Sequence, residues 1–286
     1  MRYSCIAVFL GFAFGMAMGS ASAQKIEGPA WDVATGFLYN SNLSNAERST
    51  DVESDFFWQM EGGASWSRAI ERDWRLRARA FAGGSVPFEY EAFNQARLGT
   101  DLELGYKHGL GPMAPTVRAG LTVERDFFEE DGRSRWFITP GLRARQPLSE
   151  SVGVELHYRF DTSRAIAPLF DGYGNEGGVT LTWEATDRLS FSAGYRARYG
   201  DVVSYAAPPR PDIVGVADVI VPGTTTFNRT LTAYRLEAFT QTAHASVFFA
   251  LLPELSLAVQ YRFQHTTRAA ISYDNHLVEF GIKAGF

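Results

Sequence analysis

The last stretch of the chain, Asn275–Phe286, alternates strictly between apolar and polar residues. The apolar positions are Val278, Phe280, Ile282, Ala284 and Phe286, with Glu279, Gly281, Lys283 and Gly285 between them. An alternation of period two predicts an extended strand that turns one face to an apolar environment and the other to a polar one. Because the chain ends on an aromatic side chain, the apolar face extends to the last residue.

Alternation of the same kind recurs through the chain and predicts an all-β protein of about twelve strands. Each predicted strand is close to the ~9–11 residues that a tilted strand needs to cross a membrane, and no later segment has the ~18 consecutive apolar residues of a transmembrane helix. The predicted strands are Trp31–Tyr39, Phe56–Ser67, Trp74–Ala82, Ala96–His108, Pro115–Glu124, Arg135–Arg145, Ser151–Asp161, Gly178–Glu184, Arg188–Tyr199, Tyr234–Phe249, Leu255–His265 and the closing stretch.

The N-terminal region has the three parts of a secretory signal peptide. Arg2 is the charged n-region, Cys5–Met18 is a short apolar h-region, and Ala21–Ala23 is a small-residue cleavage site. We therefore expect residues 1–23 to be a signal peptide, cleaved after Ala23, and residues 24–286 to form one β-barrel. Since Cys5 is the only cysteine, the mature chain has no disulfide and no Cys-ligated metal.

The predicted connections differ in length according to their parity. With the amino end in the periplasm, every second connection is periplasmic, and these are the short ones. The long connections, among them Asn40–Asp55 and Gly200–Thr230, fall on the outer side. Membrane barrels have short periplasmic turns and long extracellular loops, whereas a soluble β-sandwich has no reason to sort its loops in this way. The pattern favours a closed antiparallel transmembrane β-barrel.

The export signal, the strand pattern and the terminal Phe286 together resemble the outer-membrane β-barrels of Gram-negative bacteria. The closing strand of those proteins typically ends in Phe as part of an assembly signal. The resemblance implies an outer-membrane location, with membrane lipid, lipopolysaccharide and the outer-membrane assembly machinery as partners. It also implies that Phe286 belongs to the assembly signal.

All six tryptophans have the outward parity and lie near the ends of predicted strands. The amphipathic indole ring suits the headgroup level of a membrane. We therefore expect an interfacial girdle formed by Trp31, Trp58, Trp66, Trp74, Trp136 and Trp183.

Positive charge is concentrated on the inward face. Without Arg2 the chain has 26 Lys+Arg against 32 Asp+Glu, a formal net charge of −6, which argues against a nucleic-acid partner. Parity nevertheless gives the inward face more cations than anions. A guanidinium is always charged and grips carboxylate or phosphate bidentately, so this lumen would favour small anionic solutes. The candidate lumen and selectivity residues are Arg75, Arg77, Arg79, Arg118, Arg143, Arg145, Arg196, Arg198, Arg262 and Lys283.

The same arginines also have a purely structural interpretation, because cross-strand ion pairs hold neighbouring strands together. Long arginine side chains would also fill much of a narrow twelve-stranded lumen. The expected neighbours are Arg75, Arg77 and Arg79 beside Asp101 and Glu103, Arg143 and Arg145 beside Glu155, and Arg196 and Arg198 beside Glu184.

The strand number and the arginine-rich inward face are similar to those of the oligogalacturonate and sialic-acid porins of enteric bacteria. This likeness of architecture implies a passive channel for acidic solutes. The segment Thr35–Phe57 also resembles the first hairpin of β-barrel porins and of the barrel half of surface-lipoprotein assembly factors. Those factors carry a helical-repeat domain ahead of the barrel, and this sequence shows none.

One group of residues is loosely similar to the His-x-Ser…Glu arrangement of lipid A deacylases: His265, Thr266, Thr267 and Glu279. A nucleophile, its base and an orienting acid must share one face to reach one another. His265 and Thr267 have the outward parity, whereas Glu279 has the inward one, and Thr replaces the nucleophilic Ser. We therefore expect no catalytic residues and no enzyme.

Two other polar motifs have simpler interpretations. His157, between Glu155 and Arg159, forms either an acid/base dyad or part of the charged inward face. The segment Asp171–Gly178 (DGYGNEGG) is rich in oxygen ligands but lacks the spacing and terminal Glu of a Ca²⁺ site, so we expect a flexible surface loop. No metal site and no cofactor are expected.

Three functions are compatible with such a barrel. The first is a passive, anion-preferring channel in which Gly200–Thr230 folds inward as a constriction. The second is an outer-leaflet hydrolase of lipid A or phospholipid. The third is a structural or adhesive barrel with a filled lumen, whose function lies in the outer loops. The charged inward face favours the first.

Overall fold

The computed structural model describes residues 6–7, 29–207, 210–269 and 271–286. The predicted signal peptide and its cleavage site lie outside the described residues, apart from β1 (Ile6–Ala7), which pairs antiparallel with Gln95 and Asn94. Because β1 belongs to the segment that we expect to be cleaved, this pairing is not part of the expected mature barrel.

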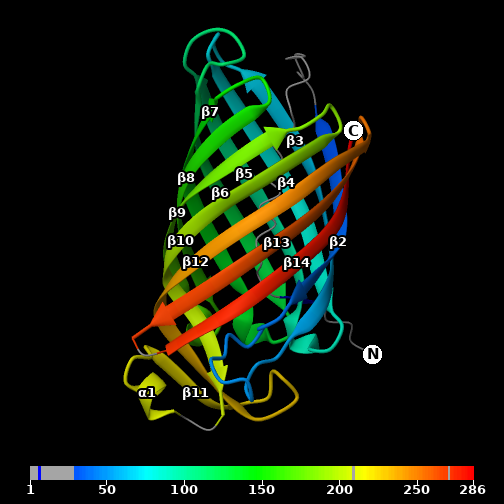
Figure 1. Ribbon diagram of the computed structural model, residues 1–286. Helices are drawn as coiled ribbons and strands as arrows, with labels where there is room; N and C mark the ends of the chain where they lie inside the picture. The colour runs from blue at the N-terminus through cyan, green and yellow to red at the C-terminus, as the bar shows by residue number, and fades with distance from the viewer. Residues whose placement is uncertain (1–5, 8–28, 208–209, 270) are drawn as a thin grey trace.

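Twelve strands form one closed ring in chain order (Figure 1). They are β2 (Ala30–Asn40), β3 (Asp55–Ala69), β4 (Trp74–Pro87), β5 (Asn94–Lys107), β6 (Thr116–Phe128), β7 (Arg135–Pro147), β8 (Val152–Ala165), β9 (Gly172–Glu184), β10 (Leu189–Ala206), β12 (Leu231–Leu252), β13 (Leu255–Arg268) and β14 (Ile271–Gly285). Each pairs antiparallel with its neighbours, and β14 closes the ring on β2, with Phe280 opposite Phe37. The predicted fold class is confirmed.

Exposure alternates along the strands, as a ring with two different faces requires. In β14, Val278 and Phe280 are 44% and 46% exposed, whereas Leu277 and Glu279 are 0% and 5% exposed. The outward residues are apolar and most inward residues are polar or charged, which is the alternation of a membrane barrel. The parity rule on which the sequence analysis depends therefore holds in the structure.

The two ends of the barrel have different connections. We call one the turn end, because its connections are the short segments 70–73, 108–115, 148–151, 185–188 and 253–254. The opposite loop end, at the bottom of Figure 1, carries segments 41–54 and 210–230 and every short helix of the described residues. Those helices are η1 (Glu91–Phe93), η2 (Asp131–Arg133), η3 (Pro168–Phe170) and α1 (Pro211–Val214). In the part of the chain described, no helix has the length and apolar character needed to cross a membrane.

The six tryptophans all lie on the outside of the ring and are 39% to 59% exposed. Trp58 and Trp136 are near the loop end, and the other four, Trp31, Trp66, Trp74 and Trp183, are near the turn end. The outward run of β2 from Trp31 to Tyr39 covers roughly 20 Å along a tilted strand, close to the ~25 Å apolar band of outer-membrane barrels. This placement suits a girdle at both interfaces, which remains a prediction.

The strands extend further at the loop end than the sequence predicts. β4 continues to Pro87, and the last hairpin narrows to the connection between Arg268 and Ile271. The predicted irregular segment Gly200–Thr230 is wrong in two respects: β10 continues to Ala206, and the rest contains α1 and β11 (Val219–Thr224), which pairs with β12 outside the ring. Turn-like composition misled the prediction, because extended backbone beyond the membrane level needs no outward apolar alternation.

The predicted surface loop Asp171–Gly178 is also wrong, because β9 begins at Gly172. Its glycines signal turns in the sequence. In the barrel, Gly174 and Gly178 are inward positions of β9, and neighbouring side chains lie directly against them. Space for those side chains explains the glycines better than loop flexibility does.

Candidate functional site: the lumen and its loop-end mouth

The predicted selectivity residues all occupy inward positions of the ring, but their surroundings differ. At the turn end Arg75, Arg77 and Arg143 are exposed and form no ion pair with any described residue. Nearby, Arg118 and Arg145 make only long pairs, 3.8 Å from Arg118 Nη1 to Glu103 Oε1 and 3.9 Å from Arg145 Nη2 to Glu184 Oε1. Inward yet exposed cations mean that the turn-end half of the lumen is in contact with water.

Further along β4, Arg79 crosses a whole strand to reach its partners. Its Nη2 donates to Asp32 Oδ2 on β2 at 2.8 Å and to Glu61 Oε1 on β3 at 2.7 Å. Between β4 and β2 the guanidinium passes over Gly63 of β3, which is the register partner of Asp32. A Cβ at Gly63 would lie 2.7 Å from Nε and Nη2 of Arg79. The glycine thus lets the arginine lie against the barrel wall.

The same arrangement occurs again on strands β8, β9 and β10. Arg198 of β10 donates through Nη2 to Asp161 Oδ2 of β8 at 2.9 Å. It passes over Gly174 of β9, the register partner of Asp161, and a Cβ at Gly174 would be 2.3 Å from Nη2 of Arg198. Again an arginine reaches a carboxylate two strands away across an inward glycine.

A third example joins β5 to β3. Arg97 pairs with Glu61 across Gly83 of β4, and both Arg97 and Glu61 are register partners of Gly83. A Cβ at Gly83 would be 2.8 Å from the Met60 carbonyl oxygen and 3.3 Å from Nε of Arg97, so here the backbone of β3 crowds the position as well as the arginine. We call each such trio an Arg–Gly–carboxylate brace. The three braces are Arg79–Gly63–Asp32, Arg97–Gly83–Glu61 and Arg198–Gly174–Asp161.

A cationic cluster surrounds Glu176 on β9. Arg159 Nε lies 3.1 Å, His157 Nε2 3.5 Å and Arg196 Nη1 3.8 Å from Glu176 Oε1. His157 and Arg196 are both register partners of Gly178, where a Cβ would be 2.5 Å from His157 Cε1. His157 therefore belongs to the charged wall and not to a dyad with Glu155.

The register sets Arg77 opposite Glu103, Arg79 opposite Asp101 and Arg145 opposite Glu155, as expected, but the shortest ion pairs of Arg79 and Arg198 reach carboxylates two strands away. Arg79 contacts Asp101 only at 3.8 Å, and Arg198 pairs with Asp161 and not with Glu184. Glu184 is opposite Ser190, six positions before Arg196, which shows why parity without register could not choose the partner. Deeper in the lumen, Arg262 pairs with Glu279 at 3.1 Å, and Lys283 lies in the electrostatic range of Asp32 and Arg79.

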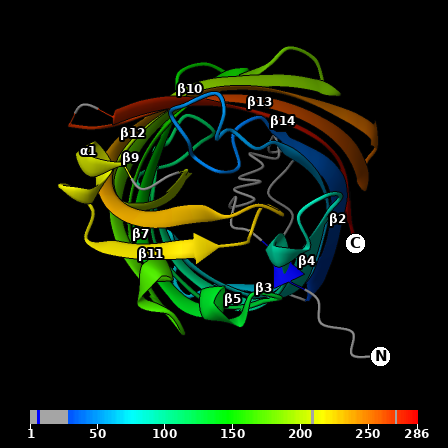
Figure 2. The ribbon, with the colours of Figure 1, turned by 90° about the horizontal axis from the view of Figure 1, so that it is seen from below.

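The loop-end mouth contains an apolar cluster built from all around the ring. Phe227 lies at its centre, with ring centroids 5.1 Å from Tyr90, 5.2 Å from Phe93 and 5.0 Å from Tyr205. The buried members are Leu38, Leu43, Phe57, Tyr90, Phe93, Leu169, Phe170, Tyr205, Phe227, Leu231, Ala233 and Leu277. In Figure 2, which views the loop end, segment 41–54 and β11 lie across the opening of the ring. Sequence periodicity missed this cluster because half of its members lie in loops and short helices, and the others are apolar residues at inward positions of the strands.

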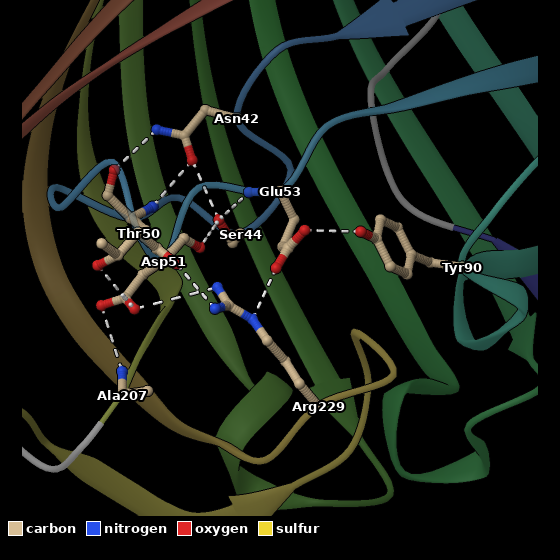
Figure 3. A network of polar contacts seen from close by, with 9 residues as sticks. Asn42, Ser44, Thr50, Asp51, Glu53, Tyr90, Ala207 and Arg229 are labelled. Carbon is tan, nitrogen blue, oxygen red and sulfur yellow. Dashed lines mark hydrogen bonds and ion pairs between the residues drawn. The ribbon is translucent and has the colours of Figure 1, made fainter.

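A polar network fixes segment 41–54 to the loop after β11 (Figure 3). Arg229 Nε lies 2.7 Å from Glu53 Oε1, and Arg229 Nη1 donates to the Thr50 carbonyl at 2.7 Å. The Tyr90 hydroxyl donates to Glu53 Oε2 at 2.6 Å. Burial and this bond to Glu53 raise the pKa of Tyr90 above its usual value.

Two further arginines tie the loops together. The guanidinium of Arg133 stacks between Phe93 and Phe170, at 4.5 and 4.3 Å from their ring centroids, and donates to the Tyr205 hydroxyl. Arg210 pairs with Glu47 at 2.6 Å and with Asp212, and the hydrogen bond from Arg210 lowers the pKa of Asp212. We call segments 41–54 and 210–230, together with the apolar cluster and these contacts, the mouth cover.

The residues compared with a deacylase do not assemble as a triad. Glu279 faces inward and pairs with Arg262. The exposed His265 instead contacts Asp274, at 2.7 Å between Nδ1 and Oδ1, and Thr267 Oγ1 makes a 3.5 Å bond to the Phe239 carbonyl. Among the residues described, no group of three or more His, Cys, Asp and Glu side chains is arranged to hold a metal ion.

The ring, its two-faced alternation and its polar lumen define a closed β-barrel of the membrane type. No protein-family model matches the sequence, and no curated protein matches it either. The structure is similar to that of the COG4313 outer membrane channel from Pseudomonas putida F1, with a TM-score of 0.63 at 9% identity over 91% of this chain and 96% of that one. Two other barrels superpose less well. They are the NanC porin (TM-score 0.44, 10% identity, 89% of this chain and 98% of that one) and the KdgM porin in complex with disordered oligogalacturonate (0.40, 12%, 88% and 99%). The first likeness establishes the fold.

Proposed function

We propose that the protein is a porin-like channel of a Gram-negative outer membrane that passes small hydrophilic solutes and favours anions. The observation that carries the proposal is the group Arg75, Arg77 and Arg143, inward, exposed and without an ion-pair partner among the described residues. Arginines that are paired with carboxylates contribute to the stability of the barrel wall. The three unpaired arginines instead leave a net positive electrostatic potential in the water-filled turn-end half of the lumen, which we call the vestibule. Such a potential concentrates anions and repels cations.

We propose in addition that the channel is gated, with the mouth cover as the gate. The apolar cluster around Phe227 occupies the loop end, so solute passage requires segments 41–54 and 210–230 to move apart. The two segments are joined by side-chain hydrogen bonds and ion pairs and not by a continuous backbone ladder, so they open at a lower free-energy cost than a barrel wall. We therefore place the gate at the loop end and the anion-attracting vestibule at the turn end, facing the periplasm.

Planar bilayers test the proposal. The purified mature protein, held in a salt gradient, is expected to conduct with a reversal potential on the anion side. Arg77→Ala combined with Arg143→Ala should move that potential toward zero, whereas Arg68→Ala, which removes an outward arginine near the same end, should not. A cation-side potential, or absence of conductance after loop removal, would contradict it.

A filled, structural barrel is the second candidate, and the mouth cluster favours it. In that case function lies in the outer loops, and the vestibule is only a hydrated dead end. Deleting residues 211–224, which removes α1 and β11 outside the ring, distinguishes the gated channel from the structural barrel. The deletion should increase the conductance of a gated channel, whereas a structural barrel should still show no conductance.

We also propose the partners that accompany an outer-membrane location. Phe286 is 75% exposed at the turn end, and its backbone exchanges hydrogen bonds with Trp31 beside the ring closure. An exposed terminal aromatic on the closing strand is available to the assembly machinery before the ring closes. Phe286→Ala should therefore lower the amount of assembled barrel in cells without changing the conductance of the molecules that assemble.

A further inference from the structure

We infer that the inward glycines of the Arg–Gly–carboxylate braces determine how far the lumen arginines project into the bore. Gly63, Gly83 and Gly174 would then be specificity-determining positions, although none of them carries a side chain. This inference rests on the proposed channel function and adds to it the positions that set the bore's free cross-section.

The first argument is the recurrence of one geometry. In each brace the arginine, the glycine and the carboxylate lie on three consecutive strands, and the glycine is the register partner of the carboxylate. The braces occur on β2–β5 and again on β8–β10, far apart in the sequence. A single close approach could be incidental, but three arginines with the same path across an inward glycine indicate a common requirement.

The second argument is steric. Heavy atoms of a side chain essentially never lie under 3 Å from a Cβ, yet a Cβ at Gly63 or Gly174 would be 2.7 or 2.3 Å from the guanidinium. With any larger residue the guanidinium has to leave the wall. The backbone of β3 and β9 blocks it on one side, so the free direction is toward the bore axis.

The third argument is the cost of glycine in a strand, which weakens it by roughly 0.5–1 kcal/mol relative to alanine. Such positions call for a local reason. The outward neighbours Gly62 and Gly177 have none of this crowding: a Cβ there would meet its nearest atoms at 3.7 and 3.9 Å, an ordinary contact. Adjacent glycines of one strand thus provide a test position and a matched control.

Single-channel recording gives the first test. Gly63→Ala should lower the single-channel conductance because Arg79 is displaced into the bore, while Gly62→Ala should conduct like the wild type. Adding Arg79→Ala to Gly63→Ala should restore the conductance, since the obstruction is removed. Comparison of single and double variants isolates the effect of the glycine on the arginine from any effect on the strand itself.

A second test does not depend on conduction. Phenylglyoxal modifies accessible guanidinium groups, and mass spectrometry of the folded protein in detergent locates the modified arginines. Gly63→Ala should raise the labelling of Arg79 severalfold over Gly62→Ala, and Gly174→Ala should do the same for Arg198 over Gly177→Ala. The folded state of each variant is checked by the mobility of the unheated sample on a gel.

The outcomes separate the two proposals. If the wild type fails to conduct in any condition but labelling of Arg79 rises in Gly63→Ala, the channel proposal fails and the glycines still hold the arginines on the wall. If Gly63→Ala and Gly62→Ala give the same conductance and the same labelling, the inference is overturned. Loss of folding in Gly63→Ala alone leaves the Gly174 and Gly177 pair to decide in the same way.

Discussion

Arginine has different roles at the two ends of the lumen. At the turn end, Arg75, Arg77 and Arg143 are exposed and have no carboxylate within ion-pair distance among the described residues. At the loop end, Arg133, Arg210 and Arg229 are engaged with aromatic rings, carboxylates and carbonyls. Arginine is an unpaired, hydrated charge at the turn end, and at the loop end it holds the loops together.

The difference shows that the partners of a charged residue, and not its abundance, decide its role. Between the two ends lie the braces, in which arginines are neutralised while lying against the wall. A lumen arranged in this order has an electrostatic vestibule, a neutralised middle and an apolar mouth.

Phe227→Ala should have the largest effect, because it removes the centre of the mouth cluster. Truncating a buried phenylalanine costs about 3–5 kcal/mol, and Phe227 contacts three other aromatic rings of the mouth cluster. We expect faster hydrogen exchange in segment 210–230 and a higher probability of the open state in bilayers. Phe239→Ala, which truncates an outward ring, serves as control, and a mouth equally protected in both variants would show that Phe227 does not hold it closed.

Arg77→Ala with Arg143→Ala should change selectivity without affecting stability. A unit charge about 10 Å from a passing ion contributes about 0.4 kcal/mol in water, so losing two charges lowers the anion-to-cation permeability ratio by about tenfold at low salt. Reversal potentials measured at two salt concentrations check this, since screening should reduce the difference. A ratio unaffected by the double variant at low salt would mean that the vestibule charges do not govern permeation.

Arg229→Met should loosen the mouth cover by a smaller amount. The Arg229 side chain is 37% exposed, and partly exposed ion pairs contribute roughly 0.2–1 kcal/mol. Hydrogen exchange of segment 41–54 should rise slightly, and added salt should reproduce much of the effect in the wild type. Arg48→Met, in the same loop, provides the comparison. The same protection in all three proteins would remove Arg229 from the mouth cover.

Asp212→Asn should give the smallest effect, and one that depends on pH. The lowered pKa of Asp212 means that its pair with Arg210 stabilises the loop above the ordinary carboxyl pKa and is lost as pH falls through the lowered value. Wild type and variant should therefore differ in exchange of segment 211–224 at neutral pH and become alike once the pH falls below the lowered pKa of Asp212. A difference that persists in acid would assign the effect to something other than this carboxylate.

Sequence periodicity predicted the barrel well, because a residue's parity alone decides whether it faces lipid or lumen. It placed the closing strand, the outward tryptophans and the inward arginines correctly on the ring. It predicted Arg79 beside Asp101 but not the shorter pairs of Arg79 with Asp32 and of Arg198 with Asp161, because these depend on the register between three strands and on which intervening residue is a glycine.

The mouth cover was equally hidden. Phe227 lies in a loop with no period to read, and Asp171–Gly178 combines turn residues with a strand conformation. The inward glycines Gly63, Gly83 and Gly174 all lie beside charged residues on neighbouring strands. Composition could not show that these glycines leave space for arginine side chains from neighbouring strands.

Cysteine scanning of β4 tests the central claim, that one face of each strand lines a watery bore and the other meets lipid. The expected mature chain contains no cysteine, because Cys5 is the only one in the sequence, so each introduced thiol reports alone. With the protein in lipid bilayers, a charged water-soluble thiol reagent should modify cysteines at positions 75, 77 and 79 rapidly and those at 76, 78 and 80 slowly. Uniform reactivity along the strand, or the opposite alternation, would contradict the assignment of its two faces.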